Sequence, residues 1–178
     1  MGAIMWRVVK SFFLHVALML LALGLIWLVV QGQDALSAAV RLRYQGRSAQ
    51  ALLTVLEDQR GRLMMWCFIS FLVSWLASSV FLAAAERARP AGEIEAKGKI
   101  GLWSLMLVVT IVFVIFTAWL NLIEAGVSAS LSSGTFLTAV LIGGIATVLA
   151  YYFATGLMVR RVMRPSVPLA TALPTTWS

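Results

Sequence analysis

Hydrophobic residues fill four long stretches of the chain, and none of the four contains Asp, Glu, Lys or Arg. The stretches cover residues 11–33, 63–85, 100–123 and 125–159. An α-helix rises about 1.5 Å per residue, so roughly 20 apolar residues cross the ~30 Å hydrocarbon core of a bilayer. The pattern therefore predicts an all-α, polytopic membrane protein whose four transmembrane helices cover residues 11–30, 63–85, 100–122 and 135–159.

The segment between the first two spans, residues 31–62, is the one sizeable connection, and its pattern is helical. Four apolar residues recur at helical spacing, with polar side chains on the other face: Ala49, Leu52, Leu53 and Leu56. A weaker helical pattern covers residues 34–44, and Gly46 separates the two. We expect one or two amphipathic helices at the membrane interface here.

The two ends of the chain are short, and both carry basic residues. Residues 1–10 carry Arg7 and Lys10. The apolar run that follows is longer than the 7–15 residues of a typical signal peptide, so we expect it to remain as a span. Residues 160–178 begin with arginines and continue with prolines among Ser and Thr, a composition that predicts a disordered tail.

Composition argues against several classes of function. The chain has 178 residues, of which 61% are hydrophobic and 12% charged, which is too apolar for a soluble domain. A lone cysteine, Cys67, and a lone histidine, His15, exclude a disulfide framework, a bis-histidine haem and most zinc sites. Intramembrane catalysis needs a nucleophile–base pair or several metal ligands, so we expect no cofactor and no enzymatic activity.

The excess of basic residues predicts orientation. The formal net charge is +7, and basic residues gather on the cytoplasmic flanks of spans, so the charge does not indicate nucleic-acid binding. Nine Lys and Arg fall on the side that carries both termini and five on the other. This distribution predicts an inner-membrane protein with both termini on the cytoplasmic side. Seven of the nine form clusters that set topology or contact anionic lipid, topology being favoured: Arg87, Arg89, Lys97, Lys99, Arg160, Arg161 and Arg164.

Five of the seven tryptophans fall near the ends of the predicted spans, as in aromatic belts, while Trp75 falls in the middle of the second span. Trp27, Trp66 and Trp119 are expected at the outer interface, and Trp6 and Trp103 at the inner one.

Two stripes of small residues lie within the spans. In the second span the stripe is Ser70, Ser74 and Ser78, and in the fourth it is Ala139, Gly143 and Thr147. Small residues four apart let helix backbones approach closely, and hydroxyls bond across the interface. Helix packing is the favoured interpretation, and the lining of a hydrophilic path is the alternative.

The third span has a polar face. Its residues fall on one side of a continuous helix: Thr110, Thr117, Asn121 and Glu124. A carboxylate deep in a bundle marks a functional site, but Glu124 stands where the apolar run ends. A solvated carboxylate is favoured over ion coupling or a salt bridge to Arg60 or Arg62.

His15 lies shallow in the first span, and a histidine side chain ordinarily titrates near neutral pH, which would suit proton relay. A relay needs partner acids, and the sequence offers none at matching depth. The pattern therefore favours an imidazole that is hydrogen-bonded to a neighbouring helix or to headgroups. Cys67 is expected to be an inert small hydrophobe.

These features predict a non-enzymatic subunit or scaffold of a larger inner-membrane assembly, whose partners are the lipid bilayer and other membrane-protein subunits or further copies of the chain. The architecture resembles small accessory subunits of conjugation and secretion systems and of multi-subunit transporters, without any signature residue. The alternative is a small homo-oligomeric channel or carrier lined by the Thr110–Glu124 face.

Overall fold

The computed structural model describes residues 2–43, 47–87, 93–124 and 133–172 of the chain, and nearly all of these residues are helical. None of the residues in these ranges forms a strand. Four segments are long and apolar enough to cross a membrane: Ile4–Val29, Arg60–Arg87, Ile94–Leu120 and Leu137–Met158. The prediction of an all-α protein with four transmembrane helices is confirmed.

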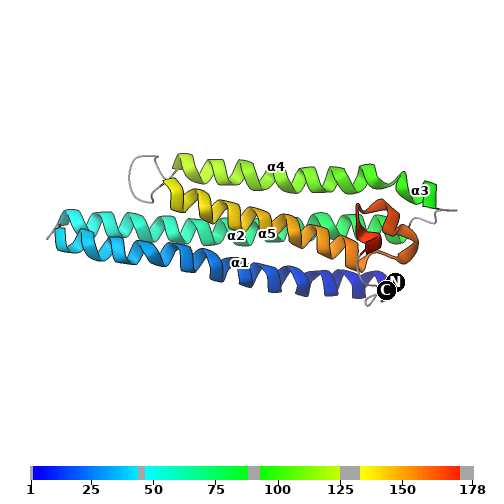
Figure 1. Cartoon of the computed structure of the whole chain (residues 1–178), viewed down its shortest axis with the longest axis horizontal. Helices are drawn as coiled ribbons and strands as arrows, with labels where there is room; N and C mark the ends of the chain where they lie inside the picture. Colours follow the sequence, from blue (N-terminus) through cyan, green and yellow to red (C-terminus); the bar gives the residue numbers. More distant parts are fainter. Residues whose placement is uncertain (1, 44–46, 88–92, 125–132, 173–178) are drawn as a thin grey trace.

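Helices α1 (Gly2–Arg43) and α2 (Arg47–Arg87) run antiparallel as one long hairpin (Figure 1). With 42 and 41 residues, each is about 60 Å long, roughly twice the thickness of the hydrocarbon core. Both helices continue past the ends of their neighbours in the bundle (Figure 1).

The two amphipathic segments predicted between the first two spans are helical, but they do not form separate helices along the membrane surface. They continue α1 and α2 in line. An isolated glycine costs a helix only about 1 kcal/mol, so Gly32 and Gly61 do not interrupt α1 and α2. The predicted separator Gly46 lies outside the described residues. The apolar side chains assigned to these segments (Ala49, Leu52, Leu53 and Leu56) lie outside the described side chains.

Helix α5 (Ser133–Met158) packs along both arms of the hairpin, whereas α4 (Ile100–Glu124) packs mainly on α2 (Figure 1). The short helix α3 (Glu93–Lys97) precedes α4. The buried face of α4 repeats every four residues, through Thr110, Val114 and Ala118. The outward face of α4 is apolar, as expected of a helix that lies against lipid.

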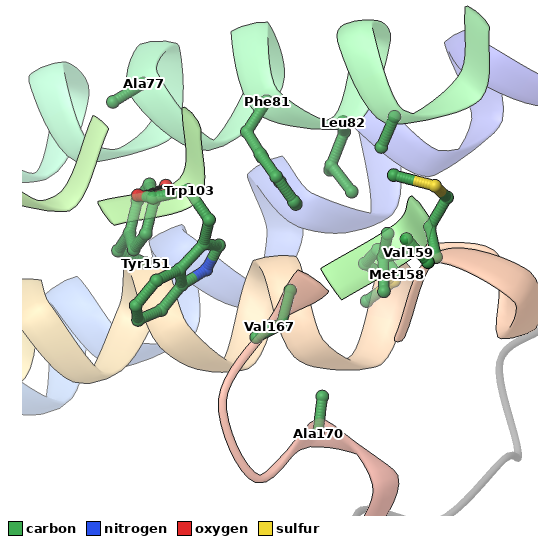
Figure 2. Packing of buried hydrophobic residues seen from close by; sticks show 12 residues of the cluster. Ala77, Phe81, Leu82, Trp103, Tyr151, Met158, Val159, Val167 and Ala170 are labelled. Carbon is green, nitrogen blue, oxygen red and sulfur yellow. Dashed lines mark hydrogen bonds between the residues drawn. The ribbon is translucent and has the colours of Figure 1, made fainter. Parts of the chain in front are cut away.

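Two clusters of buried apolar side chains occupy opposite ends of the bundle. One joins α1, α2, α4 and α5 around Ile26, Trp66 and Phe71. The other lies at the end that contains the start of α1, where Arg7 meets Glu86. It joins α2, α4 and α5 around Phe81, Trp103 and Tyr151 (Figure 2). On α2 the buried Ser74 stands between the two clusters, and Ser78 lies beside the second one.

The prediction of a disordered tail is corrected for residues 161–172. They form two short 3₁₀ helices, η1 (Arg161–Ser166) and η2 (Ala170–Ala172). Prolines prevent a longer helix here, but Met163, Val167 and Ala170 are buried in the second cluster (Figure 2). The Tyr152 hydroxyl donates to the carbonyl oxygen of Pro168 at 2.9 Å, which fastens the tail to α5. Residues 173–178 lie outside the described residues.

Candidate functional site

Polar side chains form three successive pairwise contacts between α1 and α2, which we call rungs. Arg7, Ser11 and His15 are four residues apart and so lie on one face of α1. Because α1 and α2 are antiparallel, successive residues of this face meet residues of decreasing number on α2. Arg7 Nη1 lies 3.6 Å from Glu86 Oε2 and also donates to the carbonyl oxygen of Met158, at the end of α5, at 3.0 Å. A cation at a helix C-terminus satisfies carbonyl groups that have no partner within the helix.

The second rung joins two serines. The Oγ atoms of Ser11 and Ser78 lie 3.3 Å apart, and Ser78 Oγ donates to the carbonyl oxygen of Trp75 at 2.9 Å. A serine hydroxyl has one hydrogen, so Ser11 is the donor between the two serines. Both side chains are buried.

His15 forms the third rung and is 3% exposed. Its Nδ1 lies 2.8 Å from the carbonyl oxygen of Ser11, and its Nε2 lies 3.1 Å from Ser74 Oγ. Ser74 Oγ also lies 3.1 Å from the carbonyl oxygen of Thr147 on α5. The imidazole therefore stands where three helices meet, and the predicted hydrogen bond to a neighbouring helix is confirmed.

Close packing between α2 and α5 continues one turn further along α5. The Thr147 hydroxyl donates to the carbonyl oxygen of Gly143 at 2.7 Å. A Cβ atom at Gly143 would lie 2.7 Å from Cζ3 of Trp66, closer than carbon atoms can approach. A side chain at position 143 would therefore displace the Trp66 ring, which explains the glycine in the predicted small-residue stripe.

Two indole N–H groups attach α4 to the rest of the bundle. Trp66 Nε1 on α2 donates to Thr117 Oγ1 at 3.1 Å and approaches the carbonyl oxygen of Val114 at 3.3 Å. Trp103 Nε1 on α4 donates to Thr155 Oγ1 on α5 at 2.9 Å. Both rings are buried, so Trp66 and Trp103 are interior donors and not residues of an interfacial belt, whereas Trp6, Trp27 and Trp119 are exposed.

The predicted serine stripe lies within helix contacts. Ser70, Ser74 and Ser78 are all fully buried, and the last two bond to α1. Ser70 Oγ has no hydrogen-bond partner among the described residues.

On the predicted polar face of α4, both threonine hydroxyls form hydrogen bonds. The Thr110 hydroxyl donates to the carbonyl oxygen of Met106, and the Thr117 hydroxyl donates to that of Phe113 while it accepts from Trp66. The side chains of Asn121 and Glu124 lie outside the described residues. The two threonines thus serve helix packing in this structure.

The basic residues named as candidate lipid contacts differ in their exposure. Arg87, Lys97, Lys99 and Arg161 are exposed, and Arg160 is half-buried. Arg164 differs, since only 4% of its surface is exposed and it lies within the folded tail. Arg89 lies outside the described residues.

Sequence reasoning missed Arg7, Ser11 and Glu86 as partners in the α1–α2 contact. The signal was present, because Arg7, Ser11 and His15 repeat at the same spacing as the serines of α2. Within the described residues, no group of three or more His, Cys, Asp or Glu side chains is placed to hold a metal ion.

No protein-family model, no curated protein and no solved structure matches this chain.

Proposed function

We propose that this multi-pass membrane protein is a non-enzymatic subunit of a larger inner-membrane assembly, with both termini in the cytoplasm. The orientation rests on nine basic residues on the side of the termini against five on the other. The start of α1 and the folded tail lie at the same end of the bundle, in keeping with four crossings (Figure 1).

The observation that carries the proposal is the length of the α1–α2 hairpin. Helices α4 and α5 have 25 and 26 residues, enough for one crossing, whereas α1 and α2 have 42 and 41. The surplus, residues 31–43 and 47–59, extends each arm by about 20 Å beyond the membrane. Helices draw most of their stability from tertiary packing, so a projecting pair of helices is suited to packing against another subunit.

The interior of the bundle supports a role in contacts more than one in transport. The described hydroxyls of the two candidate faces bond to neighbouring helices or to carbonyl groups of their own helix, apart from Ser70. A small channel or carrier is therefore the weaker proposal.

Shortening the hairpin tests the role of its projecting part. Deleting seven residues from each arm, 35–41 and 49–55, removes about two turns per helix and preserves the antiparallel pairing. We expect the spans to stay folded, as judged by circular dichroism in mild detergent, while chains that co-purify with the wild type are lost.

Arg161→Gln, an exposed change on the side of the termini, is the matched control and should retain those chains. A wild-type protein that purifies as a lone monomer would contradict the proposal, as would a shortened hairpin that keeps its partners.

A further inference from the structure

The hydrogen bonds of His15 define which ring nitrogen carries a proton. Its Nδ1 faces the carbonyl oxygen of Ser11 at 2.8 Å, and a carbonyl oxygen can only accept. Nδ1 therefore carries a hydrogen and donates it. In the neutral ring, Nε2 then has no hydrogen and faces Ser74 Oγ, 3.1 Å away, as an acceptor.

The Ser74 hydroxyl has a single hydrogen and two acceptors within reach. These are Nε2 of His15 and the carbonyl oxygen of Thr147, each 3.1 Å from Oγ. When the ring is neutral, Ser74 donates to Nε2. When Nε2 takes up a proton, Nε2 becomes the donor to Ser74 Oγ, and the hydroxyl hydrogen turns to the Thr147 carbonyl oxygen. The second state has one more hydrogen bond than the first.

Carbonyl groups provide the negative ends of dipoles at both ends of this chain of bonds, on Ser11 and on Thr147. Formal charges are more distant. On α1 they are Arg7 and Lys10, and on α2 the nearest carboxylate is Glu86, twelve residues or about 18 Å along the helix from Ser74. The other titratable side chains nearest the site are the buried Cys67 on α2 and Tyr151 on α5, whose hydroxyl donates to the carbonyl oxygen of Trp103.

We propose that His15 is a reversible proton-binding site inside the bundle, and that the Ser74 hydroxyl transmits its protonation to α5. The site can take up a proton while the His15 ring and the Ser74 hydroxyl both stay hydrogen-bonded. Rotation of the Ser74 hydroxyl, from Nε2 of His15 to the carbonyl oxygen of Thr147, is the only rearrangement that this requires. The proposal is independent of the role in an assembly, since it concerns the membrane bundle and not the projecting hairpin.

Nitrogen NMR of the ring tests the proposal directly. The chain has one histidine, so protein labelled with ¹⁵N-histidine gives signals from His15 alone. At high pH we expect a hydrogen on Nδ1 and none on Nε2. On acidification both nitrogens should become protonated while circular dichroism shows that the helices persist. The opposite tautomer at high pH would overturn the proposal, and so would a ring that stays in one state from pH 4 to 9 in the folded protein.

Two serine variants separate the hydroxyl from general packing. Ser74→Ala removes the acceptor for the protonated ring, and hydrogen bonds to a charged group are the stronger ones. At the pH where half of the wild-type rings are doubly protonated, we expect the ratio of doubly to singly protonated rings to fall about tenfold.

Ser70→Ala is the matched control, one turn away on the same face of α2 and without a hydrogen bond to His15. It should leave the ratio unchanged, and Ser74→Thr, which retains a hydroxyl, should restore it. Equal effects of Ser70→Ala and Ser74→Ala would assign the change to packing and overturn the role of the Ser74 hydroxyl.

Discussion

The contact between α1, α2 and α5 and the attachment of α4 use different side chains for the same task. In the first, groups from three helices bond in series: His15 on α1, the Ser74 hydroxyl on α2 and the Thr147 carbonyl oxygen on α5. The small serine side chains let the backbones approach closely. In the second, two large indole rings supply both the buried area and the hydrogen bonds, Trp66 from α2 and Trp103 from α4.

This difference shows how stability is distributed in the bundle. A hydroxyl that loses its partner on another helix can bond to a carbonyl group of its own helix, so the loss of one bond in the series costs little. An indole N–H cannot turn to a carbonyl group of its own helix in this way, because it is fixed to a buried ring, and the ring itself supplies buried area that no rotation replaces. The α4 attachment should therefore be the more vulnerable to single substitutions.

Replacing Trp66 should have the largest effect. Trp66→Ala removes a ring that is 2% exposed together with its bonds to Thr117 and Val114. We expect the free energy of unfolding, measured by denaturant titration in detergent micelles, to fall by about 3–5 kcal/mol. Trp66→Phe keeps most of the apolar area and should lose markedly less. If the two variants lose the same amount, the N–H bond and not the ring holds α4.

A side chain at Gly143 should have an intermediate effect. Gly143→Ala forces its Cβ to within 2.7 Å of the Trp66 ring, and overpacking of this kind costs about 1–3 kcal/mol. The adjacent Gly144 is the matched control, because a Cβ there meets Val114 Cγ1 at an ordinary 3.5 Å. Gly144→Ala should leave the free energy of unfolding nearly unchanged. Equal losses at both positions would contradict the close contact with Trp66.

The smallest effects are expected from removing one hydroxyl, either in the α4 attachment or in the contact between α1 and α2. Thr155→Val removes the acceptor of Trp103 Nε1 and leaves a buried N–H unsatisfied, at a cost of about 1–2 kcal/mol. Ser78→Ala removes the partner of Ser11, which can bond to its own helix instead, so the expected loss is about 0.6 kcal/mol. The same unfolding titration measures both, and a larger loss for Ser78→Ala would reverse the comparison.

The tail and the hairpin show where local pattern misleads. Residues 161–172 contain Pro165 and Pro168, which are typical of disordered segments, yet Met163 and Val167 are buried in a cluster whose other members come from distant parts of the chain. The segments after the first span and before the second were correctly predicted to be helical. These segments continue α1 and α2 without a break, because no proline separates them from the spans. A change from an apolar to an amphipathic pattern does not by itself show whether one helix ends there.

The sequence by itself determined that four helices cross a membrane, because the length and the hydrophobicity of each stretch are local properties that add along the chain. It also located the small residues of α2 and α5. Only the tertiary structure decided which faces meet: His15 with Ser74, 59 positions away, and Trp66 with Thr117, 51 positions away. The physical reason is that lipid is as apolar as the side chains, so a transmembrane helix can rotate about its axis at little hydrophobic cost. Its orientation is then set by hydrogen bonds and close packing with other helices.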